Sequence, residues 1–487
     1  MTRQQANDEG FALFIAMGAI ILVSVVAVAG FWLSQDTLRE SRRVQSENRA
    51  FQVASTGIDR EVQRFTTSRL INGVYAISGS TPDGTYQITA QATGNPYEYR
   101  MTSVSNSGGT TETVTQRFFF LSLWDMNVGA GPAQVFGGGS GWNGNATVSG
   151  PLYVRGDMTW SSAATFEGGP LLIRDGGLIA TGSGTFGLVR PIYLYSTEGL
   201  SGNKAATNVY LADNTVHNSV PDIDLPWVEA QYMNRAYGLA KQESCDNIMG
   251  SVLRTVTNSE AESEGSPSYP AAATKATGAS SYYKYLGPSA GPSALGAGST
   301  ALTIGSTQFG RYPGNGYDSS SGKHDDFAYD PSTGTLYLEG TVFVDGPVTI
   351  TPGVRRYVGN GTLVANGDVL IQTGTGTGHG HLAPIDSITG EPTNPSPDNC
   401  LGLVTPGDVT LGSSSIDGYM IGAVFCNGTF SMYGTGTLFS GSVLAGQIYG
   451  DRPNVQLHQN AAISRCLPES MPGAGGGVVF AGTWSRS

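Results

Sequence analysis

The chain has 487 residues, of which 69 are Gly and 13% are charged, and its formal net charge is −12. This length is too great for one ordinary hydrophobic core, so we expect more than one folded part. A basic nucleic-acid-binding domain is not indicated, because neutralising phosphates requires clustered Lys and Arg.

An uncharged and mostly apolar stretch lies close to the N-terminus. It runs from Phe11 to Leu33, and at about 1.5 Å per residue a helix of this length crosses a hydrocarbon core of about 30 Å. A cleaved secretory signal would begin with a basic segment, whereas Arg3 is the one basic residue before the stretch. The sequence therefore favours a membrane-spanning helix over a cleaved signal.

The helix is expected to continue beyond the apolar stretch. No Pro occurs between Gln35 and Arg69, and apolar residues recur there at steps of three and four. These residues are Phe51, Ala54, Ile58, Val62 and Phe65. Such spacing draws one apolar stripe along an amphipathic helix. The first half of the helix therefore needs lipid or neighbouring copies of itself, and the second half is expected to lie on a folded domain.

The N-terminal sequence resembles type IV pilins over about the first 70 residues. The Gly10-Phe11 junction after a short polar leader is similar to the prepilin cleavage and methylation motif. The segment "RAFQVASTGIDREVQRF" (Arg49–Phe65) resembles the helix signature of PilX-type and general-secretion K-type minor pilins, in which an Ala-Phe pair precedes an Ala-x-x-Gly spacing. A plain N-terminal anchor is the competing interpretation.

The resemblance implies roles for individual residues. Prepilin peptidase would cleave after Gly10 and leave Phe11 as the new N-terminus. Most pilins carry Glu where this chain has Ile15, and the K-type minor pilins, which also lack that Glu, are placed at the pilus tip. The implied residues of the assembly helix are Ile15, Phe51, Ala54, Gly57 and Ile58.

The same resemblance implies partners and a location. The partners would be other pilins, prepilin peptidase and the inner-membrane assembly platform. The precursor would sit in the inner (cytoplasmic) membrane with a single pass, and the mature protein would join an extracellular bacterial pilus.

A small antiparallel sheet is predicted after the helix. Three segments alternate β-forming with polar residues and are separated by Gly, Asn and Pro, which favours strands joined by turns. The segments are Gly84–Gly94, Tyr97–Gly109 and Glu112–Trp124. Packed against the amphipathic half-helix, such a meander would form a pilin-like head.

A repeat follows beyond residue 124. Glycines flanked by β-forming residues lie at positions 156 and 176 in one block and at 346, 367, 407 and 428 in another. We interpret the 40-residue step as one missing turn plus a loop rich in Pro, Gly and Asn. A period of about 20 residues without intervening helices predicts a parallel β-solenoid, in which Gly takes corner conformations closed to other residues. A β-sandwich is the alternative, but its hairpins would not keep a fixed register.

The predicted fold is therefore mainly β: a long N-terminal helix with a small antiparallel sheet, and a large parallel β-solenoid with about 20 residues per turn. The predicted parts are leader 1–10, pilin helix 11–69, β-meander 70–126, first solenoid block 127–222, helix and Ser/Gly/Ala-rich insertion 223–335, second solenoid block 336–467, and Gly linker with terminal strand 468–487. The insertion's helix should start at Pro226. If the solenoid is inserted into the head, the terminal strand would return to complete the head's sheet.

Two groups of residues are candidates for metal or covalent chemistry. The weak candidates for Ca²⁺ ligands are Asp318, Asp325, Asp326 and Asp330, whose spacing does not match an EF-hand and equally suits an acidic surface loop. The disulfide candidates are Cys245, Cys400, Cys426 and Cys466. In an exported protein four cysteines without a CxxC pair suit up to two disulfides, and three connectivities remain open.

No catalytic residue and no cofactor other than this Ca²⁺ candidate are predicted, so the chain is not expected to be an enzyme. A β-helical polysaccharide lyase or hydrolase would need paired carboxylates, or a Lys or Arg base, facing one groove. Acids do recur beside the repeat glycines, at Asp157, Asp345, Asp368 and Asp408. Repeating corner acids are more simply explained as turn formers.

The function expected from these observations is that of a tip-located minor pilin of a type IV pilus or related pseudopilus. It would support pilus assembly and present the solenoid for adhesion or ligand capture, with a surface glycan or DNA as the ligand. The alternatives are a tip DNA receptor for natural transformation, a plain membrane-anchored surface β-helix protein, or a polysaccharide-active enzyme. The acidic balance disfavours the DNA receptor.

Overall fold

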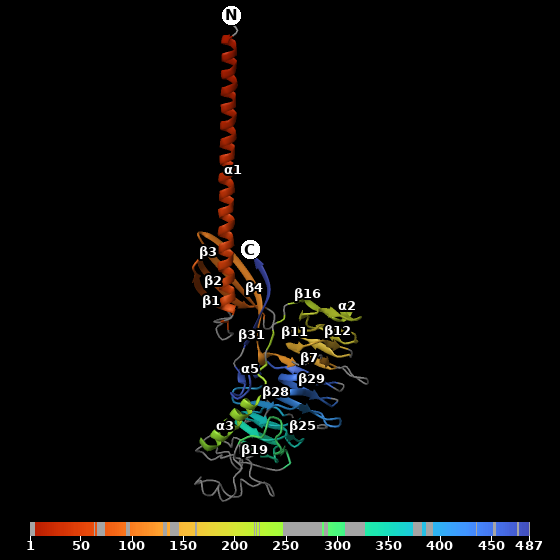
Figure 1. Ribbon diagram of the computed structural model, residues 1–487. Helices are drawn as coiled ribbons and strands as arrows, with labels where there is room; N and C mark the ends of the chain where they lie inside the picture. The colour runs from red at the N-terminus through yellow and green to blue at the C-terminus, as the bar shows by residue number, and fades with distance from the viewer. Residues whose placement is uncertain are drawn as a thin grey trace. The chain divides into compact units, whose positions relative to one another are not determined.

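The computed structural model divides the chain into two compact units, one made of Met1–Phe120 with Val479–Ser487 and the other of Leu121–Val478 (Figure 1). The residues that the structure describes are 5–62, 64–65, 74–93, 98–129, 134–136, 146–160, 163–218, 220, 222–223, 225–246, 285–286, 291–306, 327–373, 382–385, 393–434, 436–450, 454–474 and 477–486.

The first unit is a long helix with a small sheet. The helix α1 spans Gln5–Val62. The sheet has the strand order β1-β2-β3-β4-β31, and its first four strands pair antiparallel with their neighbours. The strands are β1 (Val74–Thr81), β2 (Gly84–Ala92), β3 (Glu98–Ser107), β4 (Thr110–Ser122) and β31 (Gly477–Arg486).

The C-terminal half of α1 buries its apolar stripe on this sheet. Ala54 and Ile58 are buried together with Tyr86 and Met101 of the strands. Ser105 Oγ donates a hydrogen bond of 2.6 Å to the Ala50 carbonyl, which joins β3 to the helix backbone. The periodicity of three and four residues therefore predicted the packed face of the helix correctly.

Two details of this unit differ from the sequence prediction. The helix starts at Gln5, inside the predicted leader, and ends at Val62 instead of Arg69; Arg64 and Phe65 follow in a turn closed by bonds to the carbonyls of Glu61 and Val62. The strand β1 was missed. The returning strand β31 was expected, and its place beside β4 confirms it.

The second unit is a parallel β-solenoid of about 11 turns, and the predicted fold class is confirmed. Its first block comprises β5 (Asn127–Gly129), β6 (Gln134–Phe136), β7 (Thr147–Ser149), β8 (Leu152–Arg155), β9 (Met158–Trp160), β10 (Thr165–Glu167), β11 (Pro170–Arg174), β12 (Leu178–Ala180), β13 (Thr185–Phe186), β14 (Ile192–Ser196), β15 (Leu200–Ser201) and β16 (Leu211–His217).

Its second block runs from β17 to β30. The strands are β17 (Tyr285–Leu286), β18 (Leu302–Ile304), β19 (Phe327–Asp330), β20 (Thr335–Leu338), β21 (Gly340–Val344), β22 (Val348–Ile350), β23 (Arg356–Val358), β24 (Asn360–Ala365), β25 (Val369–Ile371), β26 (Cys400–Thr405), β27 (Val409–Leu411), β28 (Tyr419–Met432), β29 (Leu438–Gly450) and β30 (Gln456–Gln459). The unit also holds the short helices η2 (Leu123–Asp125), α2 (Ala205–Asn208) and α5 (Ile463–Cys466), and the longer α3 (Ala230–Asp246).

Apolar side chains stack in ladders inside the coil. One ladder runs through the register partners Val342, Leu363, Leu403, Val424 and Val443, one residue from each successive turn. All five are buried. A single turn cannot bury such a row by itself, so stacking of neighbouring turns creates the core.

The repeat glycines are required by close approach of the turns. An added Cβ at Gly176 would lie 2.4 Å from the Gly156 carbonyl carbon, and one at Gly346 would lie 2.5 Å from the Thr300 carbonyl oxygen. Of the six repeat glycines, Gly156 alone has a positive φ, of 94°. The expected corner conformation therefore applies to Gly156, and crowding between turns explains the other five.

The two blocks form one coil in an order that differs from chain order. The first block begins at β5, and its turns follow one another through β8, β11 and β14 to β16 at one end of the coil. The coil's other end holds β17 and β18, from which the second block returns through β21, β24, β26 and β28 to β29. There β29 pairs with β5 and β30 pairs with β7. Figure 1 shows β28 and β29 between the strands of the first block and β25.

Two predictions about the second block need correction. The insertion does not extend to residue 335, because β17 and β18 already pair with β21 and β22 as turns of the coil. The 40-residue step hides no missing turn: β24 pairs directly with β26, and β25 with β27. Within the loop, Leu382 bridges Met420 and Pro384 bridges Tyr357, and Leu382 is buried in the core of the coil.

Candidate functional site

The N-terminal part of α1 is an apolar rod without a partner in its own unit. Its large apolar side chains between Ile15 and Leu33 are 55–73% exposed. Among the described residues, this is the one helix long and apolar enough to cross a membrane. Exposed apolar area of this extent is unfavourable in water, so this segment requires lipid or other apolar helices around it.

The predicted assembly residues fall on both halves of the helix. Ile15 is 59% exposed, Phe51 is half-buried, and Ala54 and Ile58 are buried on the sheet. Gly57 faces the ring of Tyr86, where an added Cβ would lie 2.9 Å from the ring carbons. Phe51, Ala54, Gly57 and Ile58 therefore hold the helix on its own sheet, while Ile15 belongs to the exposed segment.

The predicted processing junction lies within α1. Both Gly10 and Phe11 have helical backbone, and the side chain of Phe11 lies outside the described residues. Cleavage at this junction remains a prediction.

On the solenoid, one segment runs across the turns instead of along them. We call the described residues between 220 and 246 the strap. It contacts β11 through Val220 and β8 through Asp222, and further along it contacts β28 through Val228 and β21 through Tyr237. The strap therefore passes along the coil from the first block to the second.

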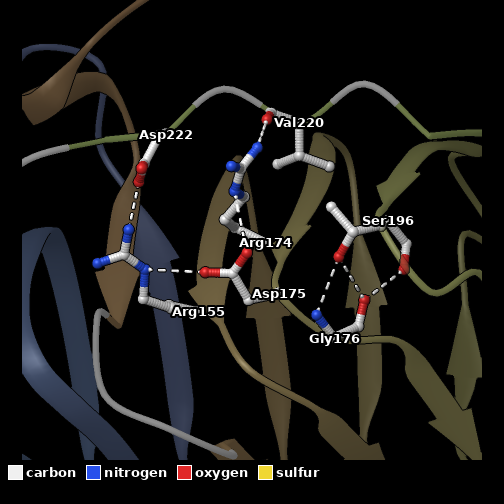
Figure 2. Close-up of polar contacts among 8 residues, drawn as sticks. Arg155, Arg174, Asp175, Gly176, Ser196, Val220 and Asp222 are labelled. Carbon is white, nitrogen blue, oxygen red and sulfur yellow. Dashed lines mark hydrogen bonds and ion pairs between the residues drawn. The ribbon is translucent and has the colours of Figure 1, made fainter.

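Two arginines on adjacent turns hold the start of the strap (Figure 2). Arg155 and Arg174 are register partners on β8 and β11. Arg174 Nη1 donates to the Val220 carbonyl at 2.6 Å, and Arg155 bonds Asp222. Asp175 lies between the guanidinium groups, 3.4 Å from Arg155 Nε and 3.1 Å from Arg174 Nε. The two cations are therefore matched by two carboxylates.

The rest of the strap is held by an amide clamp and by aromatic contacts. Asn427 Oδ1 accepts from the Val228 amide at 2.9 Å, and Asn427 Nδ2 donates to the Val228 carbonyl at 2.7 Å. Trp227 meets Phe425 edge to face at 6.4 Å, and Tyr237 meets Phe343 at 5.4 Å.

A cavity of about 620 Å³ lies between the strap and the segment that leads out of the coil, residues 467–474, which we call the exit segment. Its lining residues are Leu225, Pro226, Trp227, Glu229, Gln231, Tyr232, Arg235, Glu469, Ser470, Met471, Pro472, Gly473 and Ala474. Tyr232 OH donates to the Ser470 carbonyl at 2.7 Å, and burial raises the pKa of Tyr232. With Trp227 37% exposed beside carboxylates and a guanidinium, the cavity suits a polar ligand with an apolar face.

The sequence-predicted insertion helix maps onto the strap with two changes. Helix α3 starts at Ala230, not Pro226. Met233, Ala236 and Ala240 are buried, together with Tyr237, while Trp227 precedes the helix.

Of the candidate Ca²⁺ ligands, the structure describes Asp330 alone; Asp318, Asp325 and Asp326 lie outside the described residues. Asp330 is buried and accepts hydrogen bonds from Ser332 and Thr333 in the turn after β19. Burial raises its pKa, but these hydrogen bonds outweigh burial and lower the pKa of Asp330 overall. In the described part of the chain, no three His, Cys, Asp or Glu residues gather as metal ligands would.

The disulfide candidates separate clearly. Cys400 and Cys466 are both buried, with sulfurs 2.9 Å apart. Cys426 points into the solenoid core and is buried without a neighbouring Cys among the described side chains. The side chain of Cys245 lies outside the described residues.

Three of the corner acids bond the backbone of the following turn. Asp157 Oδ1 accepts from the Gly177 amide at 2.9 Å, Asp368 Oδ1 from the Asp408 amide at 2.9 Å, and Asp408 Oδ1 from the Thr429 amide at 2.7 Å. These carboxylates join successive turns at the corners of the coil. The acids recur in the sequence because each of these turns uses a carboxylate to bond the backbone of the next turn.

Sequence reasoning predicted a helix within the strap but missed the path of the strap along the coil and the two arginines that hold it. The signal available was that "YVRGD" and "LIRDG" carry Arg155 and Arg174 at equivalent repeat positions. Two like charges on adjacent turns repel each other unless anionic side chains lie beside them. The repeat pattern does not predict that Asp222, which lies outside the repeat, is one of these anionic side chains.

Comparison with known proteins yields a distant structural likeness. No protein-family model matches the chain, and no curated protein does. Among solved structures, the chain is similar to the competence-associated pilin ComZ from Thermus thermophilus, with 14% identity, a TM-score of 0.38, and coverage of 91% of this chain and 97% of that chain.

Proposed function

We propose that this protein is a minor pilin of a type IV pilus or related pseudopilus. Before assembly its N-terminal helix would sit in the inner membrane, and after assembly the same apolar surface would pack against other pilins. The observation that carries this proposal is the division of α1: its first half is apolar and exposed, and its second half is packed on a five-stranded sheet.

The exposed Ile15 bears on the place of this subunit in the pilus. In most pilins a Glu at this position is thought to neutralise the N-terminal ammonium of the neighbouring subunit, and Ile cannot do so. We therefore favour the tip, as in the K-type minor pilins that the helix signature resembles.

The solenoid would then be the part presented for adhesion or ligand capture. The cavity between the strap and the exit segment is a candidate for a surface glycan, because Trp227 offers a flat apolar face beside Glu229 and Arg235. Duplex DNA is a less suitable ligand for the solenoid. Two of the cations that could contact its phosphates, Arg155 and Arg174, already form ion pairs with Asp175 and Asp222. The proposed role is non-catalytic and requires no cofactor.

The proposal is tested by processing. Co-expression of the full chain with a prepilin peptidase should shorten it by the ten residues that end at Gly10, as read by intact mass. Gly10→Val should block the cleavage. Gly18→Val is the matched control, because nothing lies within 4 Å of a Cβ there, and it should be processed normally.

The outcome against the proposal is equally clear. A full-length chain that keeps Met1 in the presence of an active peptidase, and that stays in the membrane fraction, would reduce it to a membrane-anchored β-solenoid protein.

A further inference from the structure

We propose that Cys400 and Cys466 form a disulfide bond that fastens the exit segment to the solenoid. The inference rests on the proposed function in one respect, because export brings the thiols to an oxidising compartment. It selects one pairing among those that the sequence left open.

The geometry brings these two residues together from distant parts of the chain. Cys400 is the first residue of β26 and is 0% exposed, and Cys466 is the last residue of α5 and is 3% exposed. Their sulfurs lie 2.9 Å apart, with Cys466 Sγ donating to Cys400 Sγ. A small shift of either side chain converts this contact to the bonded distance of about 2.05 Å.

The surrounding hydrogen bonds hold both partners in place. Asn360 Nδ2 donates to the Cys466 carbonyl at 3.1 Å and to the Pro397 carbonyl at 2.6 Å. Asn360 itself pairs with Cys400 in the β24–β26 register. One side chain on the neighbouring turn thus contacts the backbone of Cys466 and lies beside Cys400.

Cys426 is a poor partner for either residue. Its side chain points into the apolar core of the coil, and Cys426 Sγ has a weak contact of 3.8 Å with the Gly428 carbonyl. Burial raises the pKa of Cys426, which disfavours the thiolate needed for exchange. The chain therefore contains its own control thiol.

Oxidation of the pair follows ordinary thiol–disulfide exchange. The thiolate of one Cys attacks the disulfide of a thiol–disulfide oxidoreductase and forms a mixed disulfide with release of one enzyme thiolate. The second Cys, as thiolate, then displaces the enzyme's other sulfur. Two protons leave the protein thiols, and two electrons reduce the oxidoreductase to its dithiol.

The bond would secure the place where the chain leaves the coil. Directly after Cys466 comes the exit segment, where the Pro472 carbonyl accepts from Trp124 Nε1 at 3.0 Å and the Ser470 carbonyl accepts from Tyr232. Beyond it the chain continues into β31 of the other unit. When the exit segment is pulled, a covalent link just before it keeps α5 attached to the turn that holds Cys400.

The deciding experiment uses the purified full chain in detergent. The reduced protein is incubated with oxidised glutathione, remaining thiols are blocked with N-ethylmaleimide in denaturant, and the non-reduced peptides are identified by mass spectrometry. We expect the Cys400 and Cys466 peptides to be linked in most molecules, with Cys426 blocked. Both peptides blocked, or either linked to Cys245 or Cys426, overturns the proposal.

Variants separate the bond from a general effect on folding. Reduction should lower the melting temperature of the wild-type chain and of Cys426→Ser by about 5 °C. Cys466→Ser should show no such dependence on reductant. A reductant effect that persists in Cys466→Ser contradicts the assignment.

The same thiol-blocking protocol, applied to intact cells, tests separately whether the protein is exported as the proposed function requires. A pair that links in the purified chain but stays reduced in cells upholds the disulfide geometry and contradicts export. Failure to link in the purified chain contradicts the disulfide alone.

Discussion

The carboxylate of Asp345 is the most enclosed of the corner acids. It is 1% exposed and accepts hydrogen bonds from the Ser293 amide at 3.0 Å, from Ser293 Oγ at 2.6 Å and from Asn366 Nδ2 at 2.8 Å. A buried charge is tolerated only with such a complete set of donors. Asp345 therefore joins residues 293–296 to the coil.

We expect Asp345→Ala to lower the free energy of unfolding by about 1–3 kcal/mol, since the donors would be left buried without an acceptor. Asp157→Ala is the matched control, because Asp157 is half-buried and loses one bond to the Gly177 amide. Urea denaturation of both variants gives the comparison. Equal losses at the two positions would show that burial of Asp345 has no special weight.

Gly57 permits the close contact between α1 and its sheet. Substituting Val there places a Cβ 2.9 Å from the Tyr86 ring, which is 4% exposed and has little room to move. We expect a loss of about 1–3 kcal/mol in the stability of the first unit. In Gly18→Val nothing lies within 4 Å of the new Cβ. Proteolysis of the helix–sheet unit in detergent should distinguish the two, and equal resistance would contradict this interpretation.

For single residues, the sequence predicted the burial of apolar side chains better than the burial of polar ones. Ala54 and Ile58 follow from helical spacing alone. By contrast, Asp345 precedes its repeat glycine and Asp157 follows its own, and no local rule states that the former is buried. Its burial depends on residues 293–296, which lie some 50 residues earlier in the chain.

Among the elements, the strap is held to the coil in a different way from the turns themselves. It is anchored by a few separate contacts, whereas each interior turn of the coil is bonded to two neighbouring turns. Removing one anchor should therefore open the strap locally and leave the turns intact.

Asn427→Ala tests this directly, because it removes both hydrogen bonds to Val228. We expect amide hydrogen exchange in residues 225–240 to rise about tenfold, which corresponds to about 1.4 kcal/mol. Exchange in β26 and β28 should change little. As a control, Asn460→Ala removes a side chain at another point of the coil, where its amide lies near Ser440. Faster exchange throughout the coil would show that strap and turns form one cooperative element.

The turns of the coil could be predicted from the sequence, whereas the path of the strap along the coil could not. A fixed period with β-forming residues around a Gly is a local property, and it survives in each turn. The strand β1 was missed although "VYAIS" alternates, because its segment is followed directly by Gly and Ser residues that weaken a strand pattern. The strap depends on contacts between residues about 200 positions apart, such as Val228 with Asn427.

For the whole molecule, the important feature is the seam at which the two blocks meet. There Leu444 is the register partner of Val128, and His458 is the partner of Ser149. His458 Nδ1 lies 2.6 Å from Ser149 Oγ, and burial lowers the pKa of His458.

The seam should therefore be sensitive to acid. A His whose pKa is lowered in the folded state is kept neutral there, so below the unfolded pKa of about 6.5 the unfolded chain binds the additional proton. Stability should fall between about pH 7 and pH 5, and His458→Gln should reduce this fall. Thermal unfolding across this range is the measurement, with His217→Gln at the end of the coil as the control. An identical pH profile in His458→Gln would exclude the seam as its source.

The order of the turns could not be predicted from the repeat. Every turn offers the same kind of apolar ladder, so β29 matches β5 no better by pattern than it matches any other strand. The choice is made by particular contacts, such as Asn127 Oδ1 accepting from the Val443 amide at 3.1 Å. The cavity beside the exit segment could not be predicted either, because its two walls are more than 200 residues apart in the chain.

The position of the seam has a consequence for how such a protein changes over evolutionary time. Since the chain joins and leaves the coil at interior turns, the terminal turns at β16 and at β17 carry no connection to the first unit. A relative could gain or lose whole turns at either extremity by duplication or deletion of about 20 residues. The anchoring of the coil would be inherited unchanged, while the length of the coil varied.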